Sequence, residues 1–87
     1  MSDDRYEYLR KQLEQQISFP SKYMFKFIVP KDKVEQVKPH FETGVVTEKP
    51  SSKGNYVSVT ILVIVFSPDD VLHGYKRVSH IEGIVAL

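Results

Sequence analysis

Residues 55–66, NYVSVTILVIVF, decide the fold class because they form the clearest strand pattern in the chain. A β-strand points alternate side chains to opposite faces of a sheet. One face of this segment is entirely branched and aliphatic: Val57, Val59, Ile61, Val63 and Val65. The other face begins polar and ends with Leu62, Ile64 and Phe66. The segment therefore predicts a central strand whose second half needs apolar cover on both sides.

The residues after this strand give a clear helix start. Ser67 is a favoured N-cap residue, and Pro68 suits the first helical position. Two aspartates follow, and they favour the positive end of the helix dipole. The apolar stripe of this helix is Val71, Leu72, Tyr75 and Val78, with Gly74 weakening its middle. After a break at Ser79-His80, we expect a last strand over residues 81–87.

Before the central strand, the hydrophobic pattern predicts four elements. An amphipathic helix covers residues 3–16, and its apolar positions are Tyr6, Leu9, Leu13 and Ile17. A strand over residues 22–29 follows. A short helix comes after Pro30, and Pro39 stops it because proline lacks an amide donor. Residues 45–49 then form a short strand.

The predicted order after the N-terminal helix is βαββαβ. One core accommodates this order as two right-handed split crossovers, with both helices on one face of a four-stranded antiparallel sheet. This arrangement is the ferredoxin-like sandwich of the α+β class, with strand order 4-1-3-2. We expect a single domain over residues 1–87, in which residues 1–18 form an N-terminal helical extension and residues 19–87 form the ferredoxin-like domain.

Length and composition exclude several classes of protein. A chain of 87 residues has room for one core, and the absence of cysteine favours a reducing compartment, so we expect a cytoplasmic location. The longest apolar run, residues 61–66, is too short to span a bilayer. Twelve basic and 11 acidic residues leave none of the basic excess of nucleic-acid or membrane binders. Five lysines fall between residues 22 and 38, and we interpret them as a solvated face.

The stretch KPSSKGNY, residues 49–56, followed by Ser58-Val59, resembles the YbeD-like family of small uncharacterised bacterial proteins. Phe19-Pro20 before the first strand and the closing strand ending at Leu87 are similar too, so the resemblance covers residues 19–87. It implies a ferredoxin-like domain similar to ACT regulatory domains, with a suggested regulatory connection to lipoate metabolism in some members. The family has no defined catalytic residue. The helix broken by Pro39 is shorter than the family pattern.

The loop KPSSKGN, residues 49–55, has two readings. As a recognition site, its ammonium groups, hydroxyls and turn amides would converge on a phosphate or carboxylate, although its order is not that of a P-loop. As a hairpin connection, Pro50 ends an edge strand, Gly54 supplies a positive φ and the lysines keep the loop solvated. The candidate recognition residues are Lys49, Ser51, Ser52, Lys53, Gly54 and Asn55.

A second candidate surface is the face of the sheet away from the two helices. Apolar side chains gather there: Met24, Ile28, Leu62, Ile64 and Phe66. Monomers seldom expose an apolar patch of this kind. We therefore expect either the N-terminal helix or a second subunit to cover this face, and we expect a homodimer.

No pattern for catalysis, a metal or a cofactor is present in the sequence. The three histidines lack the spacing of a helical metal site, and the serines lack a His and Asp arrangement. Tyr23, Phe25, Phe27 and Tyr56 invite comparison with RNA-binding sheets, but the required motif is missing and we interpret Phe25 and Phe27 as core. We predict a non-enzymatic regulatory or binding module that takes a protein partner or a small anionic ligand. The alternative is an RNA-binding ferredoxin-like domain.

Overall fold

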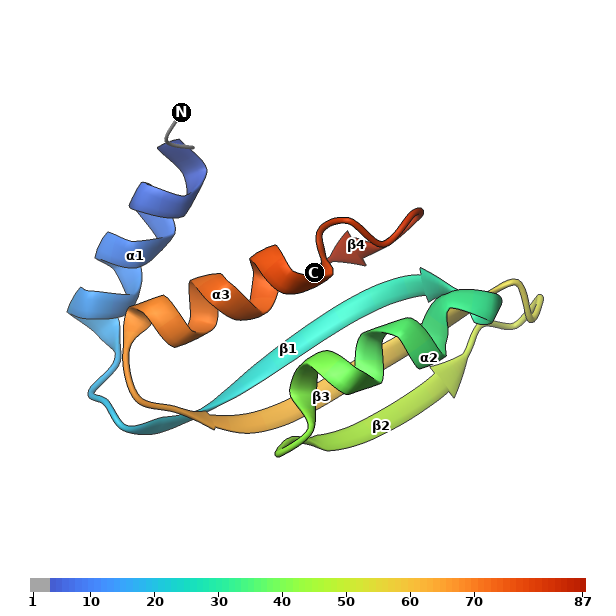
Figure 1. Ribbon diagram of the computed structural model, residues 1–87, viewed down its shortest axis with the longest axis horizontal. Coiled ribbons are helices and arrows are strands. Elements are labelled where there is room, and N and C mark those ends of the chain that lie inside the picture. Colours follow the sequence, from blue (N-terminus) through green and yellow to red (C-terminus); the bar gives the residue numbers. More distant parts are fainter. Residues whose placement is uncertain (1–3) are drawn as a thin grey trace.

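The computed structural model describes residues 4–87 and is built around a four-stranded antiparallel sheet in the order β2-β3-β1-β4 (Figure 1). The long central strands β1 (Ser21–Pro30) and β3 (Tyr56–Val65) pair along their whole length, from Ser21↔Val65 to Pro30↔Tyr56. Strands β2 (Val45–Pro50) and β4 (Val85–Ala86) form the two edges. The predicted order 4-1-3-2 is the same order read from the other edge, so the ferredoxin-like fold is confirmed.

Helices α2 (Val34–Val37) and α3 (Pro68–Val78) lie over one face of the sheet, and α1 (Asp4–Gln16) packs against α3 (Figure 1). The predicted start of α3 is confirmed, because the Ser67 hydroxyl accepts a hydrogen bond from the Asp70 amide at 3.3 Å. Arg10 of α1 forms an ion pair with Asp69 of α3. This pairing raises the pKa of the guanidinium. Both helices are therefore linked at the first turn of α3.

The segment between β1 and β2 is a chain of three short turns of helix. A 3₁₀ turn (Lys31–Lys33) leads into α2, and a second 3₁₀ turn (Lys38–Phe41) follows it. Pro39 was predicted to stop the helix; the α-helical part does end at Val37, but the chain continues as 3₁₀ turn. Proline is tolerated there because it lies in the first turn, where its missing amide has no helical partner.

The last strand is much shorter than predicted, since β4 covers only Val85–Ala86 instead of residues 81–87. Two turns occupy the difference: the Ile81 amide donates to the Val78 carbonyl at 3.0 Å, and the Ile84 amide donates to the Ile81 carbonyl at 3.3 Å. Gly83 has a φ of 83°, which breaks extended backbone. The other bounds of the helices and strands agree with prediction to within a residue, except that the predicted start of α1 at residue 3 lies outside the described residues.

The core lies between the sheet and the helices. As the alternation predicts, the inward face of β3 is buried apart from the half-buried Val63. Phe25 and Phe27 of β1 are each 1% exposed, which confirms them as core. The Phe25 ring lies 4.9 Å from that of Phe41 and 5.0 Å from that of Tyr75, measured between centroids. An aromatic cluster therefore fixes both helical segments to β1.

Candidate functional site

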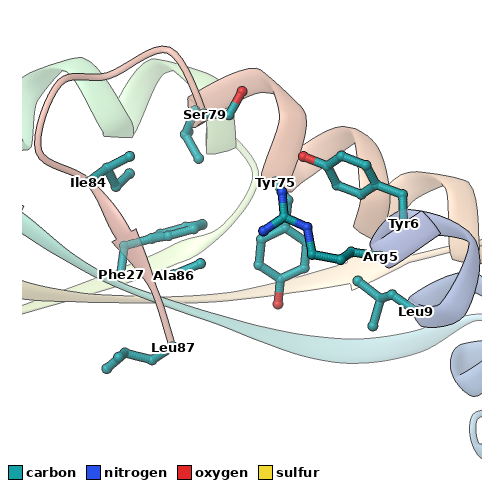
Figure 2. A pocket seen from close by; sticks show the side chains of 10 residues that line it. Arg5, Tyr6, Leu9, Phe27, Tyr75, Ser79, Ile84, Ala86 and Leu87 are labelled. Carbon is teal, nitrogen blue, oxygen red and sulfur yellow. The ribbon is translucent and has the colours of Figure 1, made fainter. Parts of the chain in front are cut away.

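A pocket of about 390 Å³ opens between α1, α3 and the C-terminal segment (Figure 2). Helix α1 contributes Arg5, Tyr6 and Leu9; α3 and its C-cap contribute Tyr75, Val78 and Ser79; the sheet and the last residues contribute Phe27, Ile84, Ala86 and Leu87. Most of these side chains are apolar. The pocket is therefore suited to a ligand with an apolar body.

The short β4 strand creates this space. It pairs with β1 only at Phe27↔Ala86 and Ile28↔Val85, and the Leu87 amide adds one hydrogen bond to the Lys26 carbonyl at 2.9 Å. Strand β1 begins five residues earlier, at Ser21, so among the described residues no strand lies beside its first half on this side. Helix α1 borders the pocket at the right of the view in Figure 2.

The polar groups of the pocket are mostly engaged within the protein. The Tyr75 and Tyr23 hydroxyls lie 2.8 Å apart in a hydrogen bond, and burial, followed by this bond, raises the pKa of Tyr75. The Ser79 hydroxyl donates to the Lys76 carbonyl at 2.8 Å. The Lys76 ammonium lies 4.8 Å from the centroid of the Tyr6 ring. The raised pKa keeps the Tyr75 hydroxyl protonated. Positive charge comes from Arg5 in the lining, and Lys76 of α3 lies close by, over the Tyr6 ring.

The KPSSKGN loop forms the β2–β3 hairpin connection. The Ser51 amide donates to the Tyr56 carbonyl at 2.8 Å, and the Gly54 amide donates to the Ser51 carbonyl at 3.0 Å. The Ser51 hydroxyl accepts a hydrogen bond from the Tyr56 amide at 3.3 Å. Gly54 has a φ of 76°, as expected for such a connection. Two of the loop amides are thus used within the hairpin, and whether the exposed Lys49 and Lys53 recognise an anion stays a prediction.

The outer face of the sheet, which points away from α2 and α3, remains open because α1 packs on α3 instead. Met24, Leu62, Ile64 and Phe66 are between 37% and 70% exposed, and Ile28 is half-buried. A hollow of about 310 Å³ on this face is lined by Ile28 together with Lys49, Ser51 and Ser52 of the hairpin. The structure thus brings part of the candidate loop and one residue of the candidate face together, while Lys53, Gly54 and Asn55 lie outside this lining.

Sequence reasoning missed the pocket at α1. In one of its two alternatives, Tyr6 and Leu9 cover the outer face of the sheet, whereas they line the space beside α3. The usable signal was Gly83, since a glycine inside an expected strand suggests that the strand is interrupted. Across residues 4–87, no group of three or more histidine, aspartate or glutamate side chains is placed to hold a metal ion. Over the same range, no helix has the length and apolarity needed to cross a membrane.

Comparison with known proteins places the chain in a family. No curated protein and no solved structure gives a significant match. Residues 14–87 match a family model described as a protein of unknown function, DUF493, and YbeD belongs to this family. The match covers most of the chain, from the end of α1 to Leu87, and it agrees with the resemblance found in the sequence at the level of an uncharacterised family. The chain therefore belongs to the DUF493 family.

Proposed function

We propose that this protein is a non-enzymatic, ACT-like binding module with a regulatory role, and that its ligand site is the pocket between α1 and α3. The observation that carries the proposal is the pocket itself. Its volume of about 390 Å³ falls in the roughly 300–1,000 Å³ range of small-molecule sites. Such sites combine apolar walls with a few polar groups, as this one does.

The walls favour a ligand with a short apolar chain and an anionic end. Leu9, Phe27 and Ile84 would contact the chain, while Arg5 on α1 supplies positive charge at the same pocket. A medium-chain carboxylic acid has this chemistry. The connection to lipoate metabolism implied by the family resemblance makes octanoate and lipoate the first probes to test.

The composition of the pocket supports binding over catalysis. Among residues 4–87, its lining includes no histidine, aspartate, glutamate or cysteine, so these residues supply no acid–base pair. Two of its hydroxyls, those of Tyr75 and Ser79, are hydrogen-bonded within the protein. The RNA-binding alternative has less support, because base stacking needs neighbouring exposed aromatic rings. The centre of the outer face carries Met24 and Leu62, and the exposed Tyr56 and Phe66 lie at the two ends of β3.

The test is a titration of isotopically labelled protein with octanoate and lipoate, followed by nuclear magnetic resonance. We expect shifts at Leu9, Tyr75 and Ala86, and at least a tenfold loss of affinity in Ala86→Phe, which fills the pocket from an exposed position. The matched control Met24→Phe adds a ring on the outer face and should bind as the wild type does. Shifts confined to the outer face, or equal affinity in Ala86→Phe, would contradict the proposal. The homodimer predicted from the sequence is a separate expectation.

A further inference from the structure

On the outer face of the sheet, the charged side chains at the described strand positions are all lysines. Strand register and alternation place three charged side chains there, namely Lys22, Lys26 and Lys49. The remaining outward strand positions are apolar, hydroxyl-bearing or proline, and none of those described is a carboxylate. The acidic residue of β2, Glu48, instead points toward the helices, where it pairs with Lys38 at 2.6 Å. A partner of this face therefore meets cations without competing internal anions.

An apolar row crosses the centre of the same face. Val45, Leu62 and Met24 lie in register on β2, β3 and β1, and they are 68%, 37% and 58% exposed. Neighbouring strands are about 4.8 Å apart, so the row is ~10 Å long. Lys22 and Lys26 lie two residues to either side of Met24, which separates them by ~13 Å along β1. The two lysines thus lie on opposite sides of the row, and the distance between them is close to the diameter of an α-helix, ~10–12 Å.

These features select among the things that could cover the face. Two copies packed face to face would bring their lysines together, and no described strand position of this face offers an acidic partner, so the contact costs binding energy. An extended segment laid on this face could not hydrogen-bond to the backbone of β1 and β3, because these strands are already paired. Its own amides would then lie on an apolar surface without hydrogen-bond partners. A helix satisfies its own backbone hydrogen bonds. Nucleic-acid bases stack on neighbouring exposed aromatic rings. The row has none, and the exposed rings of Tyr56 and Phe66 lie apart, at the two ends of β3.

We propose that the outer face binds an amphipathic helix of a partner protein, independently of any ligand in the α1–α3 pocket. The apolar side of that helix packs on Val45, Leu62 and Met24. Its flanking glutamate or aspartate side chains meet Lys22 and Lys26.

Two synthetic 18-residue helical peptides test the proposal. Both carry the same leucine stripe, but one has glutamates beside the stripe and the other has lysines. We expect the glutamate peptide to bind at least tenfold more tightly by fluorescence anisotropy, with chemical-shift changes at Met24 and Leu62 and weakening in salt. Equal affinity for the two peptides, or no binding of either at millimolar concentration, would overturn the proposal.

Charge-reversed variants locate the contact. Lys22→Glu combined with Lys26→Glu should lose at least tenfold in affinity for the glutamate peptide and gain affinity for the lysine peptide. The matched control, Lys11→Glu with Lys33→Glu, makes the same change in net charge away from this face and should stay within twofold of the wild type. Two outcomes would show that the face has another occupant and that the proposal is wrong. One is that Leu62→Glu dissociates a dimer of the protein. The other is that the protein binds phosphatidylserine vesicles or RNA more tightly than the peptide, in a way that depends on Lys22 and Lys26.

Discussion

Replacing Gly74 by alanine tests the closest approach of α3 to the sheet. An added Cβ at this buried position would lie 2.5 Å from Cζ and 2.8 Å from Cε1 of Phe25. The Phe25 ring would have to retreat by roughly an ångström to restore an ordinary contact. That ring is 1% exposed and lies 4.9 Å from the rings of both Tyr23 and Phe41, so the neighbouring rings have to move with it.

Two opposing effects set the size of the change. Alanine in place of glycine inside an exposed helix stabilises by roughly 1 kcal/mol. Overpacking of a core costs about 1–3 kcal/mol, and the enclosed position of Phe25 favours the upper part of that range. We therefore expect a net loss of about 1–2 kcal/mol. For a domain of this size, that corresponds to a fall of roughly 5–15 °C in Tm.

Urea and thermal unfolding measure this loss. The control is His73→Ala, at an exposed position in the same helix, which should leave stability unchanged or raise it by a few tenths of a kcal/mol. Combining Gly74→Ala with Phe25→Leu should cost less than the two changes added together, because the smaller side chain relieves the overlap. A Gly74→Ala protein as stable as the wild type would refute the packing described for α3.

Three further changes and one measurement test other parts of the molecule. Gly54→Val should lose about 1–3 kcal/mol on urea unfolding because φ is 76°, and since nothing surrounds its Cβ position, Gly54→Asn should recover most of that loss. Replacing Lys49 and Lys53 by alanine should change the free energy of unfolding by no more than about 0.5 kcal/mol. If the loop recognises anions, this variant should bind inorganic phosphate more weakly than the wild type in a titration. Unchanged affinity would mean that the loop is a simple turn. Because folding raises the pKa of Tyr75, the folded protein holds this proton more tightly than the unfolded chain does. The resulting stabilisation is complete at a pH below the tyrosine pKa of the unfolded chain, about 10, and is lost progressively as the pH rises above that value. Tyr75→Phe should therefore flatten the alkaline fall in Tm, and an unaltered pH profile would contradict that assignment. Sedimentation over a range of concentrations tests the predicted homodimer, and a monomer throughout would contradict it.

The order of the strands could be predicted because the two most apolar strands, β1 and β3, take the central places of the fold. The inward row of β3 is buried as expected, although Leu62 and Ile64 on its other side stay exposed. The Ser67-Pro68 cap fixes the start of α3 by local chemistry alone. The short β4 could not be predicted from its apolar residues, since Ile81 is buried equally well by a turn as by a strand. A hydrophobic pattern indicates which residues are buried, but it does not indicate whether a strand or a turn buries them.

The candidate sites were harder to predict because they depend on which surface α1 covers. The stripe of Tyr6, Leu9 and Leu13 shows that the helix needs an apolar partner, and both the outer face and α3 offer one. The Arg10–Asp69 ion pair joins residues far apart in the chain, and no local pattern signals it. The hairpin at Gly54 was predictable, because a positive φ is a local requirement of the turn.

The two-residue pairing of β4 gives the C-terminal end a dynamic character different from that of the rest of the sheet. Ile84, Ala86 and Leu87 form one wall of the pocket, yet among the described contacts β4 is held to β1 by two paired positions and the Leu87 amide. Local opening of such a segment costs only a small part of the global unfolding free energy. Its amides should therefore exchange with solvent sooner than those of β1 and β3. A ligand can enter a pocket built this way by displacing the wall, and once bound it would slow that exchange.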